Sequence, residues 1–214
     1  MRRHTVLLAF FLPSLFVLPA AAANVYDNGP VNGAEDAWAI NFGFAITDSF
    51  AVSSGNGNIG GLDFWAWLFV GDSIANIQVS IGDGPFGTQH FNNFVSLTQS
   101  SCFGNMYGYD VCMESGNFSG PNLGNGNYWL TLQNANVPSG EPAYWDENAG
   151  VNCQSPGCPS TAYNNSVGTL PSEAFTLTAA GTSTTTGSTP EPGSLWLLAS
   201  GLLGVAAIGH RRFF

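Results

Sequence analysis

The sequence predicts an all-β protein: a single β-sandwich domain of jelly-roll type, preceded by a signal peptide and followed by one C-terminal transmembrane helix. Two observations predict the sandwich, namely short segments in which apolar and polar residues alternate and turn-forming combinations of Gly and Asn between them. A third is that no convincing helical pattern lies between the two ends of the chain. Residues 24–180 are numerous enough to form one domain with a substantial buried core.

Alternation is clearest in two segments. Apolar residues occupy every second position over residues 38–46 and again over residues 75–81, as expected for strands with one buried face. Residues 62–70 (LDFWAWLFV) are apolar on both faces, which favours a central strand. Further strand candidates cover residues 91–98, 106–112, 128–133 and 174–179. Tight turns are predicted where Gly stands with Asn, Asp or Pro, at residues 55–58, 82–85, 104–105 and 124–127.

Charge is distributed very unevenly along the chain. The formal net charge is −10, from four basic and fourteen acidic residues. The basic residues are Arg2, Arg3, Arg211 and Arg212, so residues 24–189 contain no Lys or Arg, although they hold every acidic residue except Glu191. Binding to a phosphate backbone depends mainly on Lys and Arg. The composition therefore excludes nucleic acid as a partner of the central domain.

The N-terminus has the three parts of a secretory signal peptide. Arg2 and Arg3 form a basic start, residues 5–18 are almost entirely apolar, and Ala21 and Ala23 are the small residues expected before a cut at Asn24. A first transmembrane helix is the alternative, but the apolar run is short and interrupted by proline. Residues 1–23 are therefore predicted to be removed by signal peptidase, and the chain after Asn24 is expected to be exported.

A second apolar segment lies at the C-terminus. Residues 195–209 are uncharged and, as a helix, would reach roughly 22 Å, short of a hydrocarbon core of about 30 Å. A span must therefore recruit neighbouring residues, which gives a predicted transmembrane helix at about residues 193–210. Arg211 and Arg212 follow at once, and the positive-inside rule places them in the cytoplasm and residues 24–180 outside.

The tripeptide Pro190-Glu191-Pro192 stands just before this apolar segment and the terminal arginine pair. The order of these three parts at the C-terminus resembles the PEP-CTERM sorting signal of Gram-negative bacteria. The resemblance implies that Pro190, Glu191 and Pro192 are recognised by an exosortase, that Arg211 and Arg212 are the cytoplasmic stop, and that the protein accompanies exopolysaccharide production. The two prolines keep the tripeptide extended, and the Gly/Ser/Thr-rich linker at residues 181–189 makes it accessible. A permanent single-span anchor is the alternative.

Four cysteines are present, at positions 102, 112, 153 and 158. An even number of cysteines in an exported chain favours disulfides. Three pairings are possible, and we expect Cys102–Cys112 and Cys153–Cys158 because each pair is local in sequence. A zinc site is the alternative, but the intervening nine and four residues fit zinc-ligand spacing poorly.

Acidic residues of the central domain lack basic partners other than the α-amino group of Asn24 and a charged His90. Such carboxylates must be solvated, accept hydrogen bonds, or bind a cation, for which calcium is the natural candidate outside the cytoplasm. A possible Ca²⁺ site would form if the first and last strands pair and so bring together Asp27, Glu35, Asp36 and Glu173. The alternative is that these acids simply face water.

The densest group of aromatic and acidic side chains is Tyr144-Trp145-Asp146-Glu147, which we expect in a loop. Tyr144 and Trp145 are candidate glycan-binding residues if their rings are exposed, whereas burial would place them in the core. Further stacking candidates are Trp65, Trp67 and Trp129. A glycosidase needs two carboxylates facing each other across the scissile bond, a geometry that adjacent Asp146 and Glu147 rarely supply. His90 has no serine-nucleophile motif to accompany it and is interpreted as a surface or strand-end residue.

These observations predict an exported, non-enzymatic protein of the cell surface or extracellular matrix, without a cofactor except possible Ca²⁺. Its processing partners are signal peptidase and an exosortase, its C-terminal helix contacts the inner membrane, and exopolysaccharide is a candidate partner. The ectodomain would first lie in the periplasm and then reach the surface or the medium. A carbohydrate-binding module is the alternative function, and a glycan hydrolase has the least support.

Overall fold

The computed structural model describes residues 23–53, 55, 57–148 and 161–180. These described residues form β-strands joined by turns and loops and contain no helix. The strands, in chain order, are β1 (Asn24–Asp27), β2 (Ala37–Ala39), β3 (Ala45–Val52), β4 (Ile59–Phe69), β5 (Asn76–Gly82), β6 (Phe91–Ser96), β7 (Thr98–Gly104), β8 (Tyr109–Asn117), β9 (Gly126–Asn136), β10 (Tyr144–Asp146), β11 (Ala162–Asn164), β12 (Gly168–Leu170) and β13 (Phe175–Ala179). The all-β prediction is thereby confirmed.

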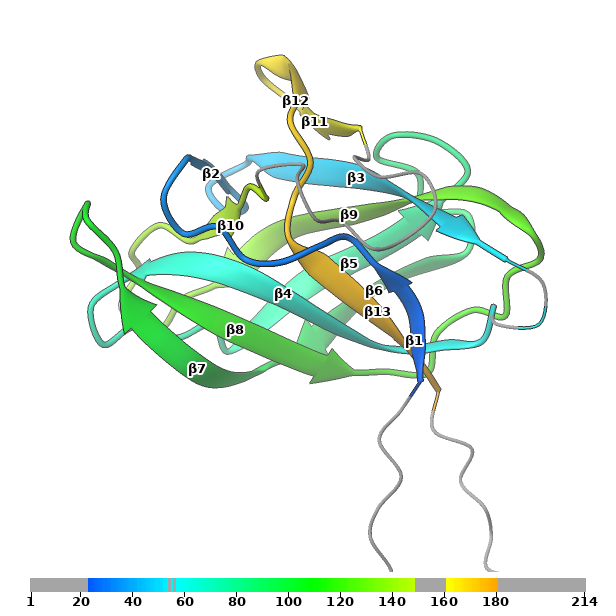
Figure 1. Cartoon of the computed structure of the whole chain (residues 1–214), viewed down its shortest axis with the longest axis horizontal. Helices are drawn as coiled ribbons and strands as arrows, with labels where there is room; N and C mark the ends of the chain where they lie inside the picture. Colours follow the sequence, from blue (N-terminus) through cyan, green and yellow to red (C-terminus); the bar gives the residue numbers. More distant parts are fainter. Residues whose placement is uncertain (1–22, 54, 56, 149–160, 181–214) are drawn as a thin grey trace, which may run out of the picture. The chain divides into compact units, whose positions relative to one another are not determined.

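The first of two antiparallel sheets is built around β4 (Figure 1). Strand β8 pairs with β4 over residues 61–69, and β7 pairs with the far side of β8. The other side of β4 pairs first with β13 and then with β10, which in turn pair with β1 and β2. The predicted central strand at residues 62–70 therefore lies at the centre of the sheet, and its apolar residues on both faces agree with this position.

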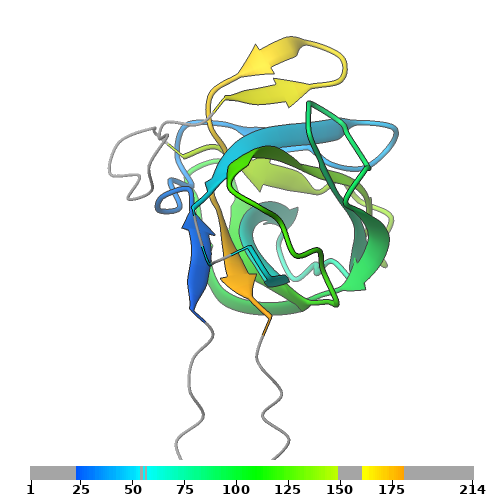
Figure 2. The same cartoon turned by 90° about the vertical axis from the view of Figure 1, so that its right-hand side faces the viewer.

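The second sheet has the strand order β12-β11-β3-β9-β5-β6. Its longest continuous pairing joins β3 to β9, from Ala45 opposite Gln133 to Val52 opposite Gly126. Both sheets curve around a common interior, as the end-on view in Figure 2 shows. The described residues thus form a sandwich-like fold, and assignment to the jelly-roll subclass stays a prediction.

The core lies between the sheets and follows the two-residue periodicity of the strands. In β4, Leu62, Phe64, Ala66 and Leu68 are all buried and face inward. The facing strands of the second sheet contribute their own buried residues, listed here as Ile46, Phe50 and Val52 from β3, Ile77, Val79 and Ile81 from β5, and Leu130 and Leu132 from β9. Burial of these large side chains supplies the main stabilising free energy of the domain.

The predicted single strand over residues 38–46 is wrong, because a turn divides it. Strand β2 ends at Ala39, and the backbone NH of Phe44 donates to the carbonyl of Asn41 at 3.0 Å to close a turn before β3. Phe42 and Gly43 adopt left-handed backbone angles, with φ of 55° and 87°. The alternation of apolar residues hid this turn because Phe42 and Phe44 are exposed rather than buried.

Two further expectations about local structure differ from the structure. The strand expected at residues 106–112 begins only at Tyr109, since residues 105–108 form a turn in which the NH of Gly108 donates to the carbonyl of Asn105 at 3.2 Å. The segment at Tyr144–Asp146, expected as a loop, is strand β10 and is held between β4 and β2. It is too short to show a sequence period of its own, so only its pairing with other strands reveals it.

The two ends of the domain lie side by side. Strand β1 pairs with β13, and the NH of Ala179 donates to the carbonyl of Ala23 at 2.8 Å. The described chain therefore begins and ends at the same edge of the first sheet (Figure 1). Within the described ranges there is no helix long and apolar enough to cross a membrane. Three predicted segments lie outside the described ranges: the signal peptide except for Ala23, the linker at residues 181–189 and the helix at residues 193–210.

Candidate functional site

A cluster of polar side chains lies between the two sheets and is called here the inter-sheet cluster. Its members are Asn28, Asp48, Asn148, Ser172 and Glu173, all buried. Asp48 comes from β3, where it occupies the inward-facing position between Ile46 and Phe50. Its carboxylate accepts hydrogen bonds from the backbone NH of Glu173 at 2.7 Å and from the Asn28 amide at 3.0 Å. A β3 side chain thereby ties the second sheet to residues beside β1 and β13.

Glu173 is the member of this cluster with the most unusual environment. Its side chain is fully buried, and among the described residues neither carboxyl oxygen has a hydrogen-bond partner. Burial, followed by the charges of Asp48 and Glu147, holds the pKa of the Glu173 carboxyl well above its usual value. Residues 24–189 contain no Lys or Arg to offset its charge, so burial disfavours the charged form of the Glu173 carboxyl.

Asp146, on β10, anchors the loop between β1 and β2. Its carboxylate accepts hydrogen bonds from the indole NH of Trp67 at 2.5 Å and from the backbone NH groups of Asn32 and Gly33 at 2.8 and 2.9 Å. Burial raises the pKa of Asp146, although these three donors act in the opposite direction. The carboxylate therefore serves to hold backbone in place.

Glu147 follows directly and accepts a hydrogen bond from the indole NH of Trp38. Burial also raises the pKa of Glu147. Because Glu147 forms a backbone bridge with Glu173, it belongs to the same acidic neighbourhood as the inter-sheet cluster. Each of the two carboxylates, Asp146 and Glu147, thus accepts a hydrogen bond from a tryptophan NH of a neighbouring strand.

Trp145 is a core residue. It has no solvent exposure, its ring meets Phe64 and Phe175 edge-on at centroid distances of 6.2 and 5.6 Å, and its indole NH donates to the carbonyl of Ala174 at 3.0 Å. This burial removes Trp145 from the candidate glycan-binding residues. Tyr144 is half-buried against Tyr109, with ring centroids 5.7 Å apart. Of the two alternatives left open by the sequence for Trp145, exposure or burial in the core, the structure shows burial.

The four residues proposed for calcium have dissimilar environments, although the pairing of β1 with β13 on which the prediction depended does occur. Glu173 is fully buried, Glu35 and Asp36 are exposed, and Asp27 is half-buried. Across the described ranges, no three His, Cys, Asp or Glu side chains are close enough to hold a metal ion. This quartet is therefore not assembled as a metal site, and calcium binding by the domain stays a prediction.

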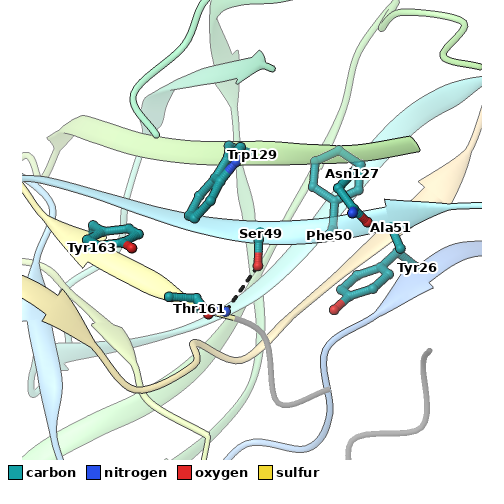
Figure 3. A pocket seen from close by; sticks show the side chains of 8 residues that line it. All are labelled: Tyr26, Ser49, Phe50, Ala51, Asn127, Trp129, Thr161 and Tyr163. Atoms are coloured by element: carbon teal, nitrogen blue, oxygen red, sulfur yellow. Dashed lines mark hydrogen bonds between the residues drawn. The ribbon is translucent and has the colours of Figure 1, made fainter. Parts of the chain in front are cut away.

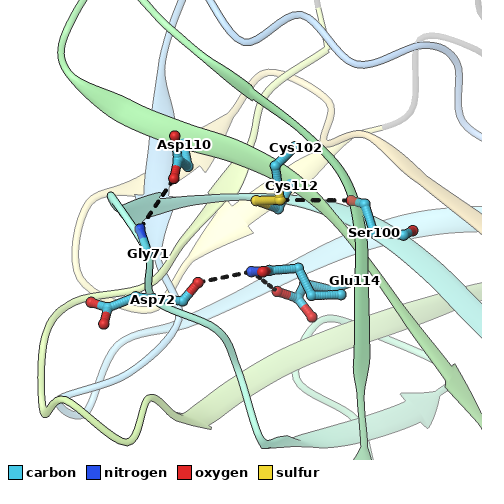
Figure 4. Close-up of a disulfide and its surroundings, with 8 residues drawn as sticks. Gly71, Asp72, Ser100, Cys102, Asp110, Cys112 and Glu114 are labelled. Atoms are coloured by element: carbon cyan, nitrogen blue, oxygen red, sulfur yellow. Dashed lines mark hydrogen bonds between the residues drawn. A yellow bond between two sulfur atoms is a disulfide. The ribbon is translucent and has the colours of Figure 1, made fainter.

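The predicted disulfide between Cys102 and Cys112 is present and joins β7 to β8 (Figure 4). It lies where the pairing of these strands is irregular, between Ser100 and Phe103, and where Ser101 adopts a left-handed φ of 52°. The covalent bond thus fixes an edge strand at its weakest point of pairing. The second expected disulfide, Cys153–Cys158, falls outside the described residues.

An aromatic pocket of about 360 Å³ lies on the outer side of the second sheet (Figure 3). Trp129 from β9 and Tyr163 from β11 have ring centroids 5.5 Å apart, and Ser49 from β3 stands directly opposite Trp129 in the strand pairing. The remaining lining residues are Tyr26, Phe50, Ala51, Asn127 and Thr161. Trp129 was a stacking candidate from the sequence. The others were missed because they come from separate strands.

The described residues that line the pocket include no charged side chain. Among three other cavities formed by described residues, Glu141 lines one and the remaining two are lined by no carboxylate. His90 does not line these pockets; it is exposed directly before β6, and its Nε2 atom lies 2.7 Å from the carboxylate of Asp83. The composition of the aromatic pocket is therefore suited to binding an uncharged molecule.

Comparison with known proteins identifies the C-terminal segment. A family model described as the PEP-CTERM protein-sorting motif matches residues 188–212, which confirms the resemblance seen in the sequence. The motif implies an exported, membrane-passing protein that an exosortase sorts. No curated protein and no solved structure matches the chain.

Proposed function

We propose that this chain is a non-enzymatic protein of the cell surface or extracellular matrix that associates with exopolysaccharide. The observation that carries the proposal is the PEP-CTERM motif at residues 188–212. In the proposed pathway the ectodomain passes through the inner membrane, signal peptidase removes residues 1–23, and the C-terminal helix holds the ectodomain in the periplasm. An exosortase then acts at Pro190-Glu191-Pro192 and releases or transfers the ectodomain.

The distribution of charge supports this pathway. Both arginine pairs lie in the segments that processing would remove, and residues 24–189 carry acidic side chains without Lys or Arg. A strongly acidic protein stays soluble through self-repulsion and avoids nonspecific contact with anionic membranes. The processed ectodomain would therefore be suited to a hydrated extracellular matrix.

Replacement of the sorting tripeptide tests the proposal. When Pro190, Glu191 and Pro192 are changed to Ala in the producing bacterium, we expect the unprocessed chain to accumulate in the membrane, as followed by mass spectrometry. The matched control changes Thr184, Thr185 and Thr186 to Ala in the neighbouring linker and should be processed normally. Appearance of the same shorter form in both variants would contradict recognition of the tripeptide.

The association with exopolysaccharide has a separate test. In cells that make the polymer, we expect the processed protein to sediment with it, and in cells with polymer synthesis disrupted we expect it in the soluble medium. Equal solubility in both strains would contradict the association. A carbohydrate-binding module is the second candidate function, and the observation that favours it is the aromatic pocket at Trp129 and Tyr163.

A further inference from the structure

We propose that the pocket formed by Trp129 and Tyr163 binds a segment of a neutral polysaccharide. This inference rests on the proposed association with exopolysaccharide and assigns to it a site and a class of ligand. The pocket has the two chemical elements that an uncharged sugar chain requires: aromatic surface for the apolar faces of sugar rings and neutral polar groups for their hydroxyls.

The aromatic surface consists of two rings that lie on neighbouring parts of the sheet. The planes of Trp129 and Tyr163 are inclined by 43° with centroids 5.5 Å apart, so the rings form an angled wall (Figure 3). Both side chains are half-buried. Each ring is therefore held by packing on one side while keeping surface available to a ligand, an arrangement that lowers the entropy lost on binding.

Neutral hydrogen-bonding groups stand beside these rings. Ser49 lies opposite Trp129, and its hydroxyl accepts a hydrogen bond from the backbone NH of Thr161 at 3.0 Å. This bond fixes the Ser49 oxygen at the pocket and leaves its own proton available as a donor. The Asn127 amide supplies both donors and acceptors at the other end of the pocket (Figure 3). Sugar hydroxyls both donate and accept, so they match groups of this kind.

Charge selects a neutral glycan over an anionic one. None of the described lining residues is basic, and residues 24–189 contain no Lys or Arg at all. A uronic acid or a sulfated sugar would lose its hydration on entry without gaining a cationic partner. It would also approach a domain that carries a large negative charge. We therefore expect anionic polysaccharides to be rejected.

The pocket is supported by the strands beneath it. Its floor belongs to β3 and β9, which form the longest continuous pairing in the second sheet. Phe50 and Tyr26 beneath it belong to the core and contact each other at a centroid distance of 5.9 Å. The site is thus supported by rigid strands, and its volume of about 360 Å³ is near the lower end of the range of roughly 300–1,000 Å³ for ligand sites.

Affinity electrophoresis of the full chain in a nonionic detergent tests the inference. The gels contain a soluble neutral polysaccharide (glucan, mannan or galactan) or, for comparison, alginate as an anionic one. We expect at least one neutral polymer to retard the protein and alginate not to do so. Trp129→Ala should weaken the retardation by about tenfold or more, since aromatic anchors dominate binding energy. Trp129→Phe should keep part of the affinity.

Two variants separate loss of the site from loss of the fold. Trp65→Ala removes a half-buried tryptophan from the other sheet and should leave retardation unchanged. Ala51→Phe fills the pocket while keeping both aromatic walls and should also abolish binding. Near-UV circular dichroism verifies that each variant is folded.

The outcomes distinguish this inference from the proposed function. Three results would overturn the assignment of the pocket: retardation that survives both Trp129→Ala and Ala51→Phe, preference for alginate, or no retardation by any neutral polymer. The association with exopolysaccharide would still stand if the protein sediments with the polymer in the producing cells. Failure of that sedimentation would instead contradict the proposed function itself.

Discussion

Burial controls the pKa of the Glu114 side chain on β8. It has no solvent exposure, and one of its oxygens accepts a hydrogen bond from the Gln99 amide at 3.1 Å. The same Gln99 amide also donates to the carbonyl of Asp72 at 2.9 Å. Burial raises the pKa of Glu114 from 4.5 to about 7, although the hydrogen bond from Gln99 lowers it in part.

This shift predicts how stability depends on pH. Because the pKa is higher in the folded state, the unfolded chain loses its proton first as pH rises, and Glu114 destabilises the fold progressively between about pH 4.5 and pH 7. Glu114→Gln should therefore be more stable than the parent at pH 7.5, by roughly 2–3 kcal/mol at most, and nearly equal to it at pH 4. Urea unfolding of both chains across this range measures the difference. A constant difference between pH 4 and pH 7.5 would contradict the assignment.

Trp145 illustrates how far a single residue can be interpreted from sequence. Beside two acids and a tyrosine it has the composition of a binding patch, yet it is fully buried between Phe64 and Phe175. Exposure depends on which strands cover a residue, and β10 is covered because it pairs with both β4 and β2. Nothing in the neighbouring residues encodes that pairing.

At the scale of elements, β7 is the strand that depends most on a covalent bond. It forms an edge of the first sheet, β8 is its one partner among the described strands, and most of its residues are exposed. Its pairing is interrupted between Ser100 and Phe103, where the Cys102–Cys112 disulfide crosses to β8. Edge strands with few buried side chains are the first to open in a folded protein.

Loss of this disulfide should loosen β7 before the rest of the domain. We expect the double change Cys102→Ala and Cys112→Ala to lower the free energy of unfolding by about 2–3 kcal/mol. Amide exchange should accelerate most in β7, as hydrogen-exchange mass spectrometry would detect. Reduced parent protein, which keeps both sulfur atoms, is the control for lost packing, because Cys112 is buried. Unchanged exchange in β7 would contradict its dependence on the bond.

A strand can be recognised from sequence when its own residues specify it, and it cannot when a turn or a partner strand decides its position. Strand β4 was recognisable because its apolar residues fall on both faces, a property of that segment alone. The segment at residues 38–46 has equally regular alternation, but the turn at Phe42 and Gly43 places Phe42 and Phe44 in solvent. Short strands such as β11 and β12 carry too few residues to show a period.

At the scale of the whole molecule, the unbalanced acidic charge is the dominant feature. Residues 24–189 have no Lys or Arg, and the described domain buries several carboxyls, with raised pKa values for Glu173, Asp146 and Glu147. Repulsion among acids and the cost of burying them both oppose folding at neutral pH. Cations in solution are the charge partners available to this domain.

Added cations should therefore stabilise the protein. We expect sodium chloride to raise the melting temperature at pH 7.5 through screening, and calcium to raise it further than sodium chloride of the same ionic strength if the predicted calcium binding occurs. Differential scanning calorimetry of the full chain in detergent, with chelator as the control, makes the comparison. Equal effects of the two salts would contradict a specific calcium site, and the absence of any salt effect would contradict the charge argument.

Several properties of this protein follow from residues that are close together in the chain. Periodicity, cysteine spacing and motif order are local patterns of this type. They determine the all-β class, strand β4, the Cys102–Cys112 pairing and the sorting motif at residues 188–212. Only the tertiary structure decided three other features: the contact between Asp48 and Glu173, the burial of Trp145, and the pocket at Trp129 and Tyr163. They join segments far apart in sequence, and which face of a strand becomes core or surface is decided only when the two sheets pack together.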